Sequence, residues 1–341
     1  MYGGPLHIVL LLAVLAGVPA SPGNVASSCG FDKEALTFAG SALEQARCLL
    51  RQVLPGGDLA PPLAHLPAPL EERIGQPVGI SEETLNRYLA AHGIPQGEIG
   101  GPLGEPLSRA RDNAPDAAIA TYFVIHGTSL PNLCEATGFP ADLDSPGWRW
   151  NRDDAYTNFP QAHIFITRDG RAVAPQGRTF KIPWRATKLE QPSSDKRTKG
   201  LFLHIENVQP RRAEPDPGFS AGPAGATPDL RFYKWDFLEA GWVCRNDRIA
   251  PEPGLSDAQL DRLALVYVAA SVRRGTWLIP AFHAAVDAGI PDAHDDPQNF
   301  DLARWAERLG KLIGEVASPA WTVPRGPLTR GAPASGRMGP S

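Results

Sequence analysis

The sequence predicts an α/β fold. Three segments carry the apolar, β-branched and aromatic residues typical of buried strands, namely AIATYFVI (118–125), AHIFITRDG (162–170) and LFLHIENV (201–208). Two later segments have the spacing of apolar residues that indicates helices, DAQLDRLALVYVAASVRR (257–274) and NFDLARWAERLGKLIGEV (299–316). Strands followed by helices within about 200 residues predict one mixed α/β domain over residues 118–316.

The chain begins with an expected export signal over residues 1–20. LHIVLLLAVLAGV (6–18) is apolar but short for a membrane span, and small residues at 18 and 20 suit signal-peptidase cleavage near Ala20. We therefore expect a periplasmic or secreted protein with no stable membrane span after signal removal. Because no Lys or Arg precedes the apolar stretch, an uncleaved anchor is the alternative.

Export makes the four cysteines expected disulfide partners; they are Cys29, Cys48, Cys134 and Cys244. Of the three connectivities, proximity favours Cys29–Cys48 and leaves Cys134–Cys244. One straight helix over residues 32–54 would hold the first pair about 25 Å apart. A break at Gly40 and a capping box starting at Ser41 predict a helical hairpin over 29–54 instead. A lipid-modified Cys29 is the rival, although ASSC is a poor lipobox.

The sequence also predicts the segments on either side of the α/β domain and two features within it. Residues 21–117 form a helical, Pro/Gly-rich N-terminal region, in which 55–81 is an ordered linker and 81–93 a helix capped by Ser81 and closed by Gly93. Within 118–316, Asp169-Gly170 predicts a hairpin turn, and 210–228 is read as a surface insertion. Residues 317–341 are expected to be extended or disordered.

Charge and composition exclude some partners. The chain has 341 residues, is 43% hydrophobic and 21% charged, and has a formal net charge of −4. This profile is that of a globular protein, and the absence of a basic stripe argues against nucleic acid or anionic lipid as the main partner.

Histidines are concentrated in the α/β domain, where five of the eight lie, at 126, 163, 204, 283 and 294. Strand alternation places Glu206 on the face opposite Leu203 and Ile205, directed toward a cleft or solvent. His126 ends the first strand. It is either a structural histidine in the turn after the strand or a functional side chain directed into a site.

The segment PAFHAAVDAGIPDAHDDPQNF (280–300) supplies His283, Asp287, Asp292, His294, Asp295 and Asp296 on a predicted loop. Zinc binds imidazole nitrogen and carboxylate oxygen, and a catalytic zinc site uses three protein ligands. His126, His283 and one Asp would form such a set. Asp287 and Asp292 are interpreted as solvated loop charges.

Taken in order, these pieces resemble the type-2 N-acetylmuramoyl-L-alanine amidase family, which shares its fold with peptidoglycan-recognition proteins. The matching motifs are IHGT (125–128), AHIFITRDG (162–170), LHIE (203–206), FH (282–283) and HDDPQNFDLARW (294–305). The resemblance covers residues 118–312. It implies a central mixed β-sheet flanked by helices.

The resemblance implies residue roles. The zinc ligands fall on His126, His283 and Asp296, the catalytic residues on Glu206 and His294, and substrate contacts on His163 and His204. Zinc would activate water, Glu206 would accept the proton of that water, and His294 would stabilise the oxyanion. The bond cut would be the amide between the lactyl group of N-acetylmuramic acid and L-Ala of a stem peptide, in peptidoglycan or muropeptides.

Three positions depart from the family pattern. Gly127 replaces a second histidine, and Gln298 replaces the glycine after Asp-Pro. The longer spacing after His283 leaves Asp295 or His294 as alternative third ligands. A peptidoglycan-binding protein that does not cut is the alternative function, and the N-terminal helical region is a candidate surface for a regulatory protein partner.

Overall fold

The computed structural model describes residues 29–54, 58–131, 139–159, 161–191, 196–211, 233–236, 241–244, 253–291 and 293–318. Its centre is a five-stranded sheet in the order β5-β4-β6-β3-β9. The strands are β3 (Tyr122–Gly127), β4 (Ile164–Ile166), β5 (Ala172–Val173), β6 (Phe202–Asn207) and β9 (Ile279–Phe282). β4, β6, β3 and β9 are parallel, while β5 runs antiparallel to β4. The expected mixed α/β fold is confirmed.

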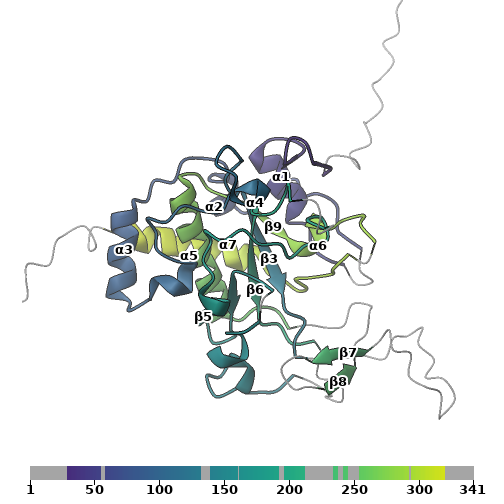
Figure 1. Ribbon diagram of the computed structural model, residues 1–341. Helices are drawn as coiled ribbons and strands as arrows, with labels where there is room; N and C mark the ends of the chain where they lie inside the picture. Colours follow the sequence, from purple (N-terminus) through teal and green to yellow (C-terminus); the bar gives the residue numbers. More distant parts are fainter. Residues whose placement is uncertain are drawn as a thin grey trace, which may run out of the picture.

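Helices cover one face of this sheet. α5 (Asp257–Arg274) packs on α7 (Leu302–Val316), and α3 (Glu82–Ala91) contacts both, so these three helices gather on one side of the strands in Figure 1. Phe123 of β3 points to this side, where its ring lies 5.2 Å from that of Tyr267 in α5. Both predicted C-terminal helices are therefore present and cover the sheet.

The N-terminal region covers the other face. Tyr122 of β3 stacks edge-on against Phe38, and its hydroxyl donates to Gln45 Oε1 at 2.8 Å. Gln45 lies in α1 (Ala42–Leu49), which packs beside β9. Residues from both regions belong to one hydrophobic core. Because side chains alternate along β3, His126 lies on this same face as Tyr122.

The predicted helical hairpin over 29–54 is wrong in its first arm. Residues before Gly40 form a two-stranded antiparallel sheet of β1 (Phe31–Asp32) and β2 (Thr37–Phe38). The break at Gly40 (φ +93°) and the capping box at Ser41 are confirmed, and so is the Cys29–Cys48 disulfide, with Cα atoms 5.8 Å apart. Tight strands bring the cysteines together without a second helix.

Other local predictions are confirmed. Ser81 caps α3, and the turn at Asp169-Gly170 joins β4 to β5, with Gly170 at φ +83°. Further short elements are α2 (Ala68–Glu71), α4 (Ala110–Asn113), α6 (His283–Val286), β7 (Tyr233–Asp236), β8 (Gly241–Cys244) and the 3-10 turns Gln96–Ile99, Arg149–Asn151, Asp153–Ala155 and Pro175–Gly177. β7 and β8 pair antiparallel.

Some predictions lie outside the described residues. These are the export signal, Cys134 with its pairing to Cys244, nearly all of the surface insertion, Asp292, and the tail from residue 319 onward. Among the helices that the structure does describe, none has both the length and the apolar character needed to cross a membrane.

Candidate metal centre

Three parallel strands deliver the key side chains to one edge of the sheet. His126 of β3 is in register with Glu206 of β6, and Ile125 is in register with Phe282 of β9. His283 follows Phe282 directly and begins α6. Because the carboxyl ends of parallel strands meet at one edge, residues far apart in sequence become neighbours there.

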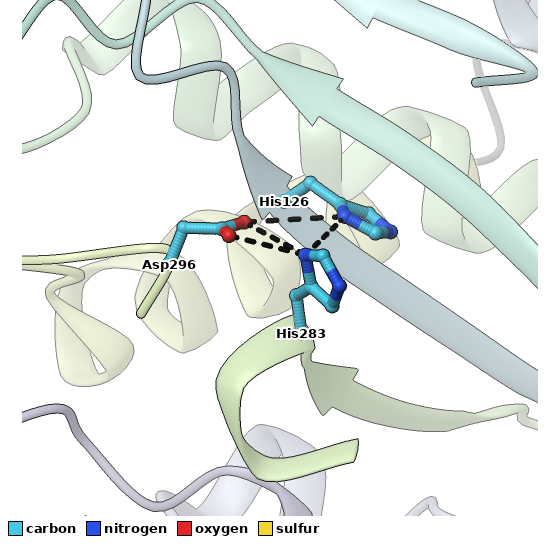
Figure 2. Close-up of side chains that lie close together, drawn as sticks. All are labelled: His126, His283 and Asp296. Carbon is cyan, nitrogen blue, oxygen red and sulfur yellow. Dashed lines mark hydrogen bonds and ion pairs between the residues drawn. The ribbon is translucent and has the colours of Figure 1, made fainter. Parts of the chain in front are cut away.

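His126, His283 and Asp296 form a buried cluster, shown in Figure 2. The Nδ1 atoms of the two histidines are 2.9 Å apart, and His283 Nδ1 lies 3.1 Å from Asp296 Oδ1. His126 Nδ1 lies 3.9 Å from Asp296 Oδ2. Donor atoms about 3 to 4 Å apart can share one ion through bonds of about 2.0–2.2 Å. The cluster is therefore a candidate metal site.

The outer nitrogens of both histidines face acceptors. His283 Nε2 lies 3.0 Å from Asp287 Oδ2, and His126 Nε2 lies 3.1 Å from His204 Nδ1. An N–H on each Nε2 leaves each Nδ1 as a bare lone pair, and two lone pairs 2.9 Å apart repel unless a positive charge lies between them. A metal ion supplies that charge, as does an additional proton, so the donor set fits a cation.

In the absence of an ion, the pKa values of the two histidines shift in opposite directions. Burial and the neighbouring His283 and His204 rings lower the pKa of His126 well below its usual value. Burial also disfavours charge on His283, but the carboxylates of Asp296 and Asp287 prevail and raise its pKa to about 10. Burial opposes ionisation of Asp296 too, yet the nearby histidines hold the pKa of Asp296 well below its usual range.

Asp296 is held in place by the backbone and by a buried amide. Gly127 donates its N–H to Asp296 Oδ2 at 2.8 Å. A Cβ at Gly127 would lie 2.3 Å from Gln209 Oε1, so Gln209 occupies the space that a side chain at position 127 would need. Gln209 in turn donates to the carbonyls of Pro253 and Gln298, both at 2.7 Å. These bonds fix the loop that carries Asp296.

Asp295 points elsewhere. Its Oδ1 lies 2.8 Å from Arg211 Nη2, and its Oδ2 accepts from Gln298 Nε2 at 3.0 Å. Asp296, and not Asp295, thus lies with the two histidines.

A cavity of about 260 Å³ opens beside the cluster, and Arg185, Glu206, His283, His294 and Asp296 are among its lining residues. Glu206 is 7% exposed and its Oε1 lies 3.8 Å from His126 Nδ1. His294 Nδ1 lies 3.6 Å from Asp296 Oδ1, and 44% of its side chain is exposed. The predicted catalytic pair therefore shares one cavity with His283 and Asp296, two of the three candidate ligands.

His163 and His204, expected to contact substrate, do not reach this cavity. Both are fully buried. His163 Nδ1 accepts the backbone N–H of His204 at 3.0 Å, and His163 Nε2 lies 2.9 Å from the Ile182 carbonyl. His204 contacts His126. A side chain with no exposed surface cannot touch a substrate without rearrangement, so their place here is behind the cluster.

The interpretation of Asp287 as a solvated loop charge is wrong. The residue is 0% exposed, and it accepts the N–H groups of Lys188 and Leu189 at 2.9 Å each. Burial raises its pKa, but the bonds to His283 and to those two amides outweigh burial and lower it. Its spacing from His283, four residues along one helical turn, was the available signal.

Comparisons with known proteins do not identify a family for this chain. No protein-family model matches the sequence, and no curated protein matches it. Among solved structures, the crystal structure of a selenomethionine derivative of AmpD is similar at 18% identity, over 60% of this chain and 92% of that chain, with a TM-score of 0.31. That score is too low to carry structural or functional conclusions.

Proposed function

We propose that this protein is a zinc-dependent amidase that hydrolyses the amide between the lactyl group of N-acetylmuramic acid and L-Ala of peptidoglycan stem peptides. The observation that carries the proposal is the cluster of His126, His283 and Asp296 beside a cavity that the Glu206 carboxylate also lines. Two histidines, one carboxylate and an adjacent acid-base residue form the donor set of a hydrolytic zinc site.

His126, His283 and Asp296 would hold the ion, with the cavity on its open side. Zinc bound there supplies Lewis acidity, which makes water a competent nucleophile near neutral pH. The two imidazoles and one carboxylate favour zinc over magnesium or calcium, because those harder ions prefer oxygen ligands throughout.

Glu206 is the proposed general base. Its carboxylate borders the cavity and lies within 4 Å of a candidate ligand atom, so it can accept a proton from a water positioned there. The same carboxyl group can then deliver that proton to the amine that leaves when the C–N bond breaks.

His294 is the proposed oxyanion stabiliser. It stands at the mouth of the cavity with its ring against that of His283, the centroids being 4.5 Å apart. An N–H at this position can donate to the negative oxygen that develops as water attacks the amide carbon.

The peptidoglycan assignment rests on the order of motifs in the sequence, from IHGT at 125–128 to HDDP at 294–297. The N-terminal apolar stretch supports export to the periplasm or the medium, where this polymer is found. A cavity of about 260 Å³ suits the scissile amide and its immediate flanks, with the remainder of a muropeptide lying outside.

The test is digestion of purified muropeptides, with mass spectrometry of the products. Zinc-loaded wild type should release the stem peptide from the lactyl group, and chelator should abolish release. Glu206→Gln should bind zinc as wild type does but lose about 10²- to 10⁴-fold in rate. Zinc-loaded wild type that binds muropeptides and releases no peptide would favour the binding-protein alternative.

The neighbouring residues Asp295 and Asp296 provide a matched pair of variants that tests which of them binds the metal. Asp296→Asn should purify with little zinc, whereas Asp295→Asn, which loses only its contacts to Arg211 and Gln298, should retain it. Zinc lost from Asp295→Asn and kept by Asp296→Asn would reverse the ligand assignment.

A further inference from the structure

Glu190 is a buried carboxyl group that the proposed reaction does not use. It is 1% exposed, and its Oε2 accepts from the N–H groups of Ala186 and Thr187, at 3.1 and 3.2 Å, and from Thr187 Oγ1 at 3.0 Å. The same oxygen lies 3.1 Å from His204 Nε2, a charge contact that falls outside hydrogen-bond geometry. One oxygen atom therefore faces both the backbone of its own segment and a histidine of β6.

His204 connects this oxygen to the metal centre. The negative charge of Glu190 beside Nε2 favours the tautomer of His204 that carries its proton on Nε2, and in this tautomer Nδ1 is a bare acceptor 3.1 Å from His126 Nε2. That acceptor calls for an N–H on His126 Nε2, which leaves His126 Nδ1 bare and directed at the cluster. Reversing the proton on His204 would reverse it on His126 and block the ligand atom. Glu190 thus governs, through one ring, which nitrogen of His126 can bind a metal.

The same short segment also reaches the second histidine. Asp287 accepts the N–H groups of Lys188 and Leu189 and faces His283 Nε2 at 3.0 Å. Residues 186–190 are therefore tied to both candidate histidine ligands by separate routes. Ala186 and its neighbour Arg185 line the cavity, so the segment that orients the ligands also forms part of the cavity wall.

We propose that Glu190 is a positioning residue of the metal centre, acting on His126 through His204 in a carboxylate–histidine–histidine relay. The proposal rests on the metal site proposed above and extends it to two residues that touch neither the ion nor the substrate. Groups that orient a histidine ligand through its outer nitrogen typically change metal affinity by about 10- to 100-fold.

The test removes and then restores the acceptor. Glu190→Met keeps the length of the side chain but offers no oxygen, and zinc affinity, measured with zinc ions in competition with a chromogenic chelator, should fall about 10- to 100-fold. Glu190→Gln can place its amide oxygen where Oε2 lies, so it should stay within about threefold of wild type. Equal affinity for Glu190→Met and wild type overturns the proposal.

A second measurement separates positioning from general loosening of the segment. Ring-nitrogen NMR of zinc-loaded wild type should find the protons of His126 and His204 on Nε2, and this needs no variant that must fold. Thr187→Val removes the hydroxyl that donates to Glu190 Oε2 and accepts the Glu190 N–H, but it leaves the oxygen that faces His204, so affinity and tautomers should not change. A proton on His204 Nδ1 overturns the relay. Wild type that binds no zinc removes the metal site itself, and with it the proposed function.

Discussion

Gly127 has two structural roles at the candidate metal centre. Its N–H holds Asp296, and its missing side chain leaves room for the buried amide of Gln209. Gly127→Ala would drive a Cβ to within 2.3 Å of Gln209 Oε1, and that amide cannot move freely because it bonds two backbone carbonyls. We expect a loss of about 1–3 kcal/mol in the free energy of unfolding, measured in urea, together with weaker zinc binding.

Gly314→Ala is the matched control. No atom of the described residues lies within 4 Å of a Cβ at this position in α7, so the substitution should raise the free energy of unfolding by about 0.5–1 kcal/mol, since alanine is the better helix former. Equal effects of the two substitutions would show that packing at Gly127 does not constrain Asp296.

Site residues were predictable from the sequence where strand patterns and motifs marked them. The sequence predicts His126, His283, Asp296, Glu206 and His294 as site residues. The last four line one cavity, and His126 lies directly behind it, in contact with His283 and Glu206. Glu190 and Gln209 were not predicted. Each lies outside the matching motifs, and their partners His204, Gln298 and Pro253 come from distant segments, so only the tertiary structure gives them a role.

Among the helices, α5 depends on its N-cap residue more than α3 does. Ser256 caps α5 through Gln259 N–H and also donates to the Arg168 carbonyl at 2.5 Å. Ser256→Ala should therefore cost about 2 kcal/mol in the free energy of unfolding. The Ser81 hydroxyl, at an exposed cap, bonds only with Thr84 of α3 among the described residues, so Ser81→Ala should cost about 1 kcal/mol. Urea unfolding of both variants checks the order, and a larger loss for Ser81→Ala would contradict it.

The elements differ in how well sequence could predict them. α3, α5 and α7 follow from caps and apolar spacing, which are local. Most of β9 falls within the segment predicted as loop, residues 280–300, because the strand is four residues long and contains Pro280. It lies at the edge of the sheet, where a missing N–H is tolerated. β1 and β2, two residues each, give no periodic signal. Their pairing depends on Tyr122, whose hydroxyl accepts the Phe38 N–H at 3.0 Å.

For the whole molecule, the pH dependence of the free energy of unfolding tests whether the buried His163 stays neutral in the folded protein. His163 is fully buried, and both ring nitrogens are committed, one as acceptor from the His204 N–H and one toward the Ile182 carbonyl. Burial, together with the charges of His204, Arg178 and Arg273, lowers its pKa to about 3. Protonation would place an N–H against an N–H.

The sign of the effect follows from linkage. Between about pH 6.5 and 3 the unfolded chain carries a proton on residue 163 that the folded protein does not, so stability is complete above pH 6.5 and falls as the pH is lowered. The contribution of this group approaches about 1.4 kcal/mol per pH unit. His163→Asn keeps an acceptor for the His204 N–H but cannot titrate, so its free energy of unfolding, though lower at pH 7, should fall less steeply toward pH 5 by close to one proton. Urea unfolding from pH 5 to 8, with chelator present so that zinc loss does not contribute, measures both slopes. Parallel slopes would mean that His163 takes up its proton in the folded state, which requires the packing behind the candidate metal centre to open in mild acid.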